Sequence, residues 1–355
     1  MSIAMPMPAS MAMPMAMSVP KPMLMAMASA PKPMMTPSAD IHTHQPVLLD
    51  EVITALAPRD GGVYVDATYG GGGYSEAILR AADCRVVAID RDPDAITRGQ
   101  EAVARHQGRL VLLEGRFSSL TDLLAGCDIQ AIDGIAFDFG VSSAQLNDAS
   151  RGFSFKHDGA LDMRMEKQGA DAADFINSAS EGDIADTLWQ LGEERASRAI
   201  ARAIVKARPI TTTGRLASVI RGVLASRKSS QKTPSQKTID PATRSFQALR
   251  LRVNNELGEI TAALPQAVRL LKPNRHLACV SFHSLEDRLV KQFMREAAGA
   301  LPRPSRHQPM SEATPAPLLS IVTSKPIRPS ADESAANPRA RSARLRVARR
   351  METAP

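Results

Sequence analysis

The sequence predicts a doubly wound α/β sheet that is interrupted by an inserted, mainly helical domain. Short apolar segments alternate with helical segments of about ten residues between 62 and 138, which is typical of βαβ units in a parallel sheet. This alternation stops between about 149 and 250 and then resumes. A run of four glycines follows the first apolar segment, where such sheets often bind a ligand.

The first part of the sheet is predicted to contain four strands and two long helices. Each strand is a short apolar run, and Pro93 suits the first turn of the second helix. The strands are expected at 62–68, 85–90, 109–115 and 132–138, and the helices at 75–82 and 93–105.

Residues 149–250 are predicted to be mainly helix and loop. Ser180 and Asp183 have capping-box spacing, residues 193–207 form a strongly helical run, and Thr213 is expected to cap another helix. The sheet pattern then resumes with helices at 253–271 and 285–296 and strands at 276–282, 318–323 and 344–348. We therefore expect a discontinuous domain at 41–148 and 251–350, with an inserted substrate-recognition domain at 149–250.

The first 40 residues differ in composition from the rest of the chain. They hold 12 of the 17 methionines and 8 of the 25 prolines. Prolines at this frequency prevent a continuous helix. We interpret residues 1–40 as a disordered extension, or as upstream sequence joined by a misassigned start codon.

The overall composition is that of a globular protein in a reducing cytoplasm. No run of 18 apolar residues lacks a charge or a proline, so no membrane span is expected. The three cysteines, Cys84, Cys127 and Cys279, suggest neither a disulfide framework nor a zinc site. His42 and His44 lack an evident third ligand, so no metal is expected. The net charge of +7 favours a polyanionic partner.

The main functional clue is the turn at 66–75, D-A-T-Y-G-G-G-G-Y-S, between a strand and a helix. Glycines let the backbone turn tightly and approach a ligand closely. Asp90 ends the second strand 20 residues after Gly70, where an acid can hold ribose hydroxyls. Because the turn lacks the third glycine of the dinucleotide motif, and the Asp66 carboxylate would repel a pyrophosphate, we favour S-adenosylmethionine. Asp66 and Asp90 are the candidate cofactor contacts.

Other candidate residues follow the ends of later strands. Asp138 ends the fourth strand and is a candidate catalytic acceptor for the proton of an attacking amine. Phe117 follows the third strand and suits either an adenine contact or the core. Gln145 lies three residues after Ser142, so it either contacts the cofactor or completes a capping box. His283 is either a second catalytic residue or a hydrogen-bonding residue at a helix entry.

Several arginines are candidate RNA contacts. The segment 337–350 holds six arginines, including Arg339 and Arg341, and no acid, and guanidinium groups suit phosphates. Its part 344–347 alternates like an edge strand with arginines on one face, which is also the pattern of a solvated strand face.

A second candidate RNA-binding group lies before the resumed sheet. Arg244 and Arg250 flank Phe246, a spacing that suits stacking and phosphate contacts, although Phe246 suits a core equally well. Asp158 and the pair Asp162 and Arg164 lie in a loop that either covers the pocket or is held by a structural ion pair.

Taken together, the ordered motifs resemble the RsmH/MraW family of 16S rRNA (cytosine-N4)-methyltransferases. The matches run almost end to end from residue 44, and so many ordered matches are far more specific than one glycine turn. They occur at 44–49, 66–75, 90–93, 137–146, 151–155, 161–165, 192–195, 243–250, 281–288 and 337–342. The resemblance implies a class I, Rossmann-like, S-adenosylmethionine-dependent methyltransferase that modifies N4 of a P-site cytidine in the small ribosomal subunit.

The resemblance also implies particular contacts and partners. The implied cofactor contacts are Gly72, Gly73, Tyr74, Asp90, Phe117, Asp138 and Gln145. The implied partner is 16S rRNA in the cytoplasm, without a membrane, and the sequence is compatible with a homodimer.

Three positions depart from the family pattern. Tyr74 replaces a histidine common in the family, Phe139 replaces leucine, and Ala160 replaces proline. Because the contact at 74 can be made partly through the backbone, we expect cofactor binding to survive. The alternatives are a methyltransferase for another nucleic acid, such as DNA, a noncatalytic ribosome-assembly factor with the same fold and, more distantly, a nicotinamide-dependent enzyme.

Overall fold

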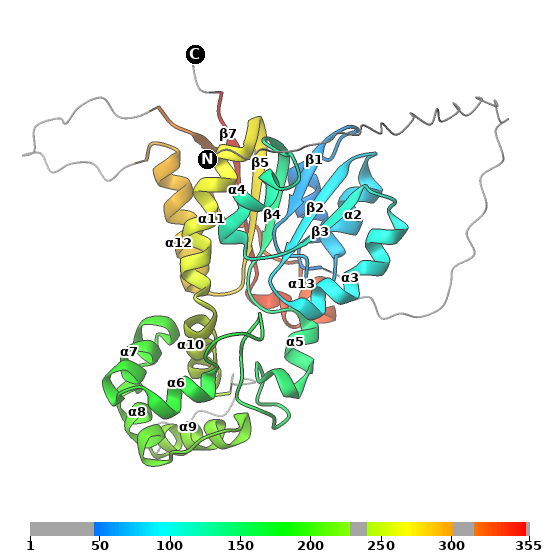
Figure 1. Cartoon of the computed structure of the whole chain (residues 1–355). Coiled ribbons are helices and arrows are strands. Elements are labelled where there is room, and N and C mark those ends of the chain that lie inside the picture. Colours follow the sequence, from blue (N-terminus) through cyan, green and yellow to red (C-terminus); the bar gives the residue numbers. More distant parts are fainter. Residues whose placement is uncertain (1–45, 228–239, 301–315, 353–355) are drawn as a thin grey trace, which may run out of the picture. The chain divides into compact units, whose positions relative to one another are not determined.

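The computed structural model describes residues 46–227, 240–300 and 316–352 (Figure 1). These residues contain a seven-stranded sheet with the order β3-β2-β1-β4-β5-β7-β6. The strands are β1 (Val63–Asp66), β2 (Arg85–Asp90), β3 (Leu110–Glu114), β4 (Ile132–Asp138), β5 (Leu271–Ser281), β6 (Leu319–Ile321) and β7 (Arg344–Arg350). The first five strands have the doubly wound order, in which the order of the strands reverses between β1 and β4 while all five stay parallel. The predicted fold class is confirmed.

Parallel pairing holds the first five strands together, and the last two are antiparallel. β1 pairs with β2 and with β4, and β4 pairs with β5, all in parallel. β7 runs antiparallel to both β5 and β6. β7 therefore lies inside the sheet, and the expectation of an edge strand at 344–347 is wrong.

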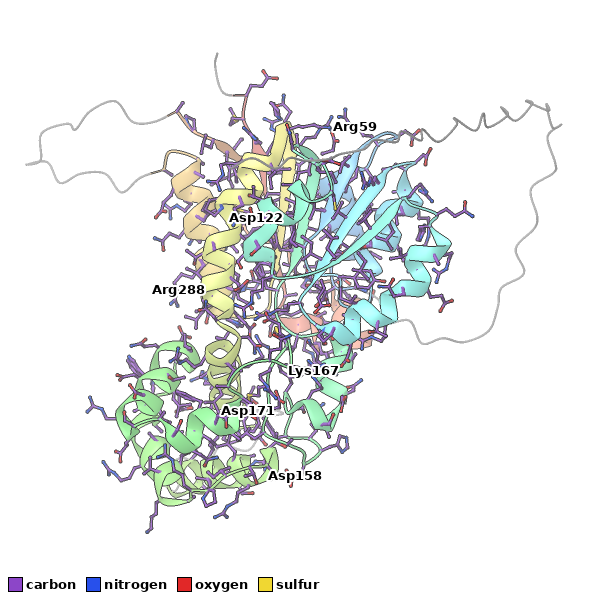
Figure 2. All side chains as sticks on the ribbon, viewed as in Figure 1. Arg59, Asp122, Asp158, Lys167, Asp171 and Arg288 are labelled. Atoms are coloured by element: carbon purple, nitrogen blue, oxygen red, sulfur yellow. The ribbon has the colours of Figure 1, made fainter. Side chains whose placement is uncertain are left out.

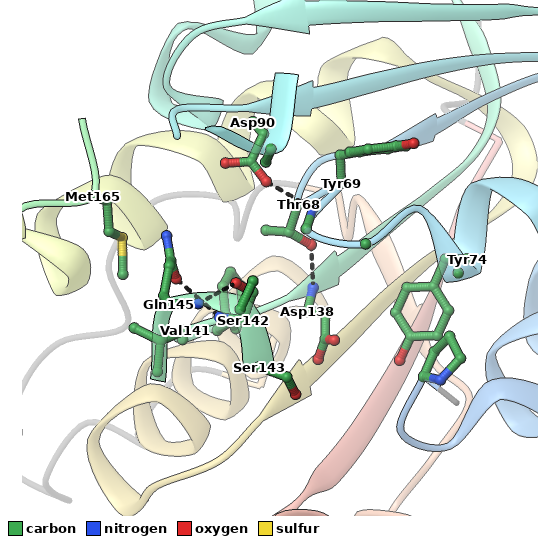
Figure 3. Close-up of a pocket in the computed structure, with 18 of the residues that line it drawn as sticks. Thr68, Tyr69, Tyr74, Asp90, Asp138, Val141, Ser142, Ser143, Gln145 and Met165 are labelled. Atoms are coloured by element: carbon green, nitrogen blue, oxygen red, sulfur yellow. Dashed lines mark hydrogen bonds between the residues drawn. The ribbon is translucent and has the colours of Figure 1, made fainter. Parts of the chain in front are cut away.

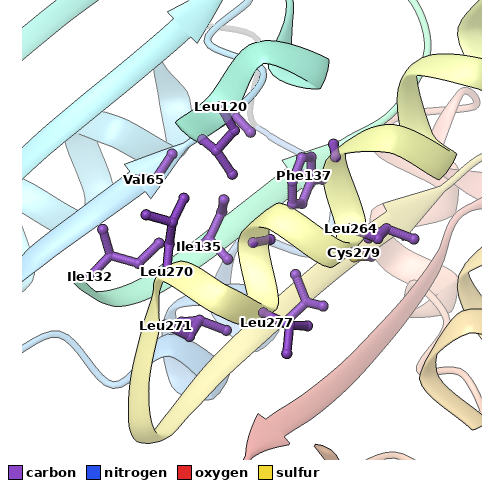
Figure 4. Close-up of a cluster of buried hydrophobic side chains, with 14 of the residues drawn as sticks. Val65, Leu120, Ile132, Ile135, Phe137, Leu264, Leu270, Leu271, Leu277 and Cys279 are labelled. Carbon is purple, nitrogen blue, oxygen red and sulfur yellow. The ribbon is translucent and has the colours of Figure 1, made fainter. Parts of the chain in front are cut away.

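Helices cover both faces of the sheet because successive strand residues point to opposite sides. On one face, Tyr64 and Val86 pack with helices α1 (Leu49–Leu56), α2 (Gly73–Ala81) and α3 (Pro93–Arg105). On the other face, Val65 and Phe137 pack with α4 (Leu120–Ala125), α11 (Glu256–Leu270) and α12 (Ser284–Ala297) (Figure 4). Each such fully buried side chain stabilises the fold by roughly 1.5–3 kcal/mol.

The region between β4 and α11 has a hydrophobic core of its own. Its helices are α5 (Ser143–Asn147), α6 (Ala172–Ser178), α7 (Glu181–Gly192), α8 (Ser197–Lys206), α9 (Thr213–Arg227) and α10 (Thr243–Asn254). Leu188, Ile200 and Phe246 are buried together there, and Figure 1 shows α6–α10 grouped apart from the sheet. The described residues do not divide into separate compact units at this point, so the boundaries at 149 and 250 stay a prediction.

Two helix predictions differ from the structure because the backbone turns left-handed at one residue. The helix expected at 253–271 is two helices, α10 and α11, separated by Asn255 at φ 49°. The helix expected at 193–207 begins only at Ser197, because Glu193 at φ 48° ends α7. β5 also begins earlier than expected, at Leu271.

Some predictions lie outside the described residues. These are the extension at 1–40 and the His42 and His44 pair. In the parts of the chain that are described, no helix combines the length and apolar character needed to cross a membrane.

Candidate active site

A pocket lies at the carboxyl ends of β1, β2 and β4, where the strand order of the sheet reverses (Figure 3). The residues that line it include most of the contacts expected from the sequence. These are Gly73, Tyr74, Asp90, Phe117, Asp138 and Gln145.

Asp66 does not line this pocket, so its expected contact with the cofactor is corrected. Its carboxyl group is fully buried and accepts hydrogen bonds from the Ser75 hydroxyl at 2.7 Å and from the backbone N–H groups of Ser75 and Thr68. Burial raises the pKa of Asp66, and these hydrogen bonds oppose the shift. Asp66 therefore links Thr68, before the four glycines, to Ser75, after them, and so stabilises the turn.

Gly72 is also absent from the pocket lining, but the turn requires a glycine there. Its φ is +77°, and an added Cβ would lie 2.7 Å from the ring of Tyr69. Gly73 does line the pocket, and an added Cβ there would overlap Pro46 at 2.0 Å. Both glycines thus allow the loop to pack tightly beside the pocket.

Asp90 joins the turn to the end of β2. Its Oδ2 accepts a hydrogen bond from the N–H of Gly70 at 2.7 Å (Figure 3). Its Oδ1 accepts one from the N–H of Asp92 at 2.8 Å. Burial raises the pKa of Asp90 to about 6. The side chain is partly exposed and lines the pocket, so it is oriented to accept further hydrogen bonds from a ligand.

Aromatic residues form one wall of the pocket. Phe117 packs edge-on against Phe137, with ring centroids 5.7 Å apart, and it also contacts Phe139 at 6.0 Å. Phe117 and Phe139 both line the pocket. The two roles considered for Phe117 therefore coexist, since one side of its ring packs in the core and the residue also borders the pocket.

Asp138 carries a buried carboxyl oxygen that has no hydrogen-bond partner in the described part of the chain. Its backbone N–H donates to the Thr68 hydroxyl at 2.7 Å (Figure 3), which fixes the residue at the end of β4. Its Oδ1 is buried and has no hydrogen-bond partner among the described residues. Burial, followed by the nearby acids Asp66 and Glu286, raises the pKa of Asp138 well above its ordinary value. Buried polar atoms are normally satisfied, so this oxygen suits a ligand.

Gln145 lines the pocket, but its side chain is already bound to the protein. Ser142 and Gln145 form the capping box of α5, with the Ser142 N–H donating to Gln145 Oε1 at 2.9 Å (Figure 3). Its Nε2 donates to Asp92 at 2.8 Å. The capping-box alternative is confirmed, so Gln145 shapes the pocket wall.

Tyr74, which stands where the family commonly has histidine, is anchored by a hydrogen bond of its own. Its hydroxyl donates to the backbone carbonyl of Val47 at 2.5 Å, and the side chain is buried. Burial raises the pKa of Tyr74 well above its ordinary value. The Tyr74 side chain is therefore neutral where it lines the pocket.

The loop that holds Asp162 and Arg164 continues beside the pocket, which agrees with one of the two alternatives that the sequence left open. Met165 lines the pocket, and its N–H donates to Asn254 at 2.8 Å. The adjacent Glu166 contacts both Arg91, at 2.5 Å, and Arg116, at 2.6 Å. These ion pairs tie the loop to the ends of β2 and β3.

Other charged residues of the loop have structural partners. Arg164 pairs with Asp162 at 2.6 Å, which confirms the structural ion pair considered above. Lys167 reaches Asp94 at 2.6 Å, and Asp158 accepts a hydrogen bond from the Gly214 N–H near the start of α9. Figure 2 shows where Lys167 and Asp158 lie.

His283 does not line the pocket, and its alternative role at a helix entry is confirmed. It is the N-cap of α12, where its ring accepts a hydrogen bond from the N–H of Glu286 in a capping box. Its Nε2 lies 3.0 Å from Glu286 Oε1, close enough for an ion pair but without hydrogen-bond geometry. A catalytic role for His283 is therefore not supported by its position.

The candidate RNA contacts fall into different environments. Arg250 is mostly buried and is paired with Glu256 at 2.7 Å, so its expected phosphate contact is corrected. Arg244 and Arg341 are exposed. Arg339 lines the pocket itself.

Two arginines of β7, Arg344 and Arg346, and the aromatic Phe246 have structural roles. Arg346 and Arg344 both bind Asp287, at 2.6 and 2.8 Å, because β7 is covered by α12. Phe246 is buried against Phe155, with ring centroids 4.6 Å apart. These side chains are thus not available to RNA.

The pocket fits S-adenosylmethionine better than a dinucleotide. Asp90 lies where an acid can hold ribose hydroxyls, which both kinds of cofactor carry, and the carboxyl group of Asp138 suits a cationic donor better than a pyrophosphate. Within the described ranges, no group of three or more potential ligands could hold a metal ion.

Comparison with known proteins identifies the family of this chain. A relative from Granulibacter bethesdensis, named ribosomal RNA small subunit methyltransferase H, is 55% identical over 320 residues, which cover 88% of this chain and 93% of the relative. A relative of the same name from Acidiphilium cryptum is 53% identical over 314 residues, covering 87% and 98%. A solved structure described as a putative rRNA-methylase from Clostridium thermocellum has a TM-score of 0.40 at 10% identity, covering 87% and 100%. The model of the MraW methylase family matches residues 41–351, and the chain belongs to that family.

Proposed function

We propose that this chain transfers a methyl group from S-adenosylmethionine to the exocyclic N4 of a P-site cytidine in 16S rRNA. The observation that carries the proposal is the pocket where the strand order reverses, which Asp90, Phe117 and Asp138 line together, with Asp138 Oδ1 lacking a hydrogen-bond partner among the described residues. The names of the relatives support ribosomal RNA of the small subunit as the substrate. The specificity for N4 of cytidine follows from the family resemblance.

Each part of the pocket has a role in this proposal. Asp90 accepts hydrogen bonds from the ribose hydroxyls, and Phe117 packs against the adenine. The backbone at Gly73 and Tyr74 borders the amino-acid end of S-adenosylmethionine. When bound, S-adenosylmethionine supplies an electrophilic methyl group on a sulfonium sulfur. Residues 149–250 are the proposed substrate-recognition domain, and the exposed Arg244 and Arg341 are proposed phosphate contacts.

Asp138 is the proposed catalytic residue. The amine of cytosine is a weak nucleophile because its lone pair is delocalised into the ring. Asp138 Oδ1 is buried and has no competing donor among the described residues, so it can accept a hydrogen bond from this amine and orient it. The bond from Asp138 N–H to Thr68 keeps the carboxyl group in place.

Methyl transfer to defined substrates tests the proposal. Tritiated S-adenosylmethionine is supplied with undermethylated 30S particles, naked 16S rRNA or DNA, and nucleosides are then identified by mass spectrometry. We expect N4-methylcytidine from the ribosomal substrate. Label in DNA alone, or binding to 30S particles without any binding of S-adenosylmethionine, would contradict the proposal. Light scattering of the same preparation tests whether the chain forms a homodimer, and cell fractionation tests whether it is located in the cytoplasm.

A further inference from the structure

Among the described residues, only neutral groups hold the Arg339 side chain at the wall of the pocket. Its Nη1 donates to the Ser143 hydroxyl, and its Nη2 donates to the Asn147 side-chain oxygen at 2.9 Å. Both partners belong to α5, which follows β4, and both Arg339 and Ser143 line the pocket. No carboxylate in the described part of the chain forms an ion pair with Arg339. Its orientation is therefore fixed while its charge is not neutralised.

Neighbouring arginines are in different situations. Arg91 pairs with Glu166, and Arg151 pairs with Asp92 at 3.0 Å, so their charges stabilise the loop beside the pocket. Arg98 also lines the pocket, but its side chain is exposed on α3.

A guanidinium group has five N–H donors in a planar arrangement that matches an oxyanion. Two of its nitrogens are oriented by Ser143 and Asn147, and the remaining N–H groups are available to a ligand. A serine hydroxyl and an amide oxygen accept hydrogen bonds without carrying a negative charge. The full attraction for an anion is therefore retained.

We propose that Arg339 is the oxyanion-binding residue of this pocket. Its ligand is either the carboxylate at the amino-acid end of the methyl donor or a phosphate of the target nucleotide. This inference rests on the proposed function, and it adds a positioning residue that holds one reactant at a fixed point beside Asp138.

The two sources of the oxyanion are separated with Arg339→Gln and the matched control Arg328→Gln, an exposed arginine outside the pocket lining. Calorimetry compares S-adenosylhomocysteine with 5′-methylthioadenosine, which lacks the amino-acid carboxylate. If Arg339 binds that carboxylate, the variant loses about tenfold or more in affinity for the first ligand and little for the second. If it binds phosphate, both affinities persist, and the salt slope of 30S binding falls by about one.

Other outcomes overturn the inference. Unchanged ligand affinities together with an unchanged salt slope would show that Arg339 binds neither anion. An equal loss of affinity for both small ligands would show that the substitution disrupts the pocket as a whole. Arg339→Lys then provides the second test. Lysine keeps the charge, so restored affinity supports an anion site, and continued loss of both ligands refutes it. Failure of the unaltered protein to bind S-adenosylhomocysteine would instead count against the proposed function.

Discussion

The backbone N–H of Gly70 donates a 2.7 Å hydrogen bond to Asp90 Oδ2, which links the glycine turn to the end of the second strand. Burial raises the pKa of Asp90 to about 6, and ribose hydroxyls would donate to its ionised form. We therefore predict that affinity for S-adenosylmethionine is constant above this pKa. Below it, affinity should fall by about tenfold per pH unit, because one proton must leave for each ligand bound.

Calorimetry between pH 5 and 8 measures this dependence. Asp90→Asn should bind weakly, with a nearly flat profile, because the titrating group is absent. A profile for the unaltered protein that is equally flat would show that Asp90 does not hold the ribose.

The sequence predicted Asp90 and Asp138 because each ends a strand at the carboxyl edge of the sheet, where topology alone sets the position. It did not place Asp66 correctly, because the choice between facing a ligand and bonding to Ser75 depends on side-chain packing. Local spacing predicted the capping role of Gln145 as an alternative. The pocket positions of Met165 and Arg339 depend on contacts with distant parts of the chain, which a single sequence does not reveal.

The methyl-transfer step should depend strongly on Asp138. Replacing it by alanine removes the buried acceptor, and we predict a fall in kcat of about 10²–10⁴-fold. Burial and then the acids Asp66 and Glu286 raise the pKa of Asp138, so kcat of the unaltered protein should rise with pH as the carboxyl group loses its proton. Single-turnover kinetics at several pH values measure both effects, with binding of S-adenosylhomocysteine as the control. An active Asp138→Ala protein would exclude this role.

The glycine turn should tolerate alanine at one position and not at its neighbour. Gly72→Ala places a side chain at φ +77° and 2.7 Å from the Tyr69 ring, and we predict a loss of roughly 1–3 kcal/mol in the free energy of unfolding. Gly71 has open space around an added Cβ and no positive φ, so Gly71→Ala should change stability by less than about 0.5 kcal/mol. Urea unfolding compares the two variants. Equal stabilities would show that the positive φ and close packing at Gly72 do not require a glycine.

Asp287 should be important for stability because it binds two arginines of β7. Burial alone would raise the pKa of Asp287, but hydrogen bonds from Arg346 and Arg344 outweigh burial and lower it. Asp287→Ala leaves the mostly buried Arg346 without its partner, and we predict a loss of about 3–5 kcal/mol.

The matched control for Asp287 is an exposed ion pair. Glu193 and Arg288 are 50% and 61% exposed, so Glu193→Ala should cost less than about 1 kcal/mol. Because the folded pKa of Asp287 is lowered, its stabilisation is fully present above its unfolded pKa of about 4 and is lost as pH falls through the folded value. Urea unfolding of the variants and of the unaltered protein, at pH 7 and at lower pH, measures the loss of stability and its dependence on pH. A loss at Asp287 no larger than that at Glu193 would contradict the prediction.

Release of the methyl donor should depend on the ion pairs that tie the Met165 loop beside the pocket. Burial tends to raise the pKa of Glu166, but its contacts with Arg116 and Arg91 lower it overall, so the side chain is ionised at neutral pH. Glu166→Gln removes that charge. Because Arg116 is about half exposed, solvent screens part of the interaction, and we predict only a three- to tenfold faster release, equivalent to about 1 kcal/mol.

Stopped-flow measurement of S-adenosylhomocysteine release tests this expectation. Glu101→Gln, which removes a carboxylate that is 89% exposed on α3, is the matched control and should leave the rate unchanged. High salt should accelerate release from the unaltered protein toward the rate of Glu166→Gln, because ions screen the contacts of Glu166 with the two arginines. If the Glu166 variant and the control release the ligand equally fast, the loop does not retain the donor. The backbone contact between Met165 and Asn254 would then be sufficient to hold the loop in place.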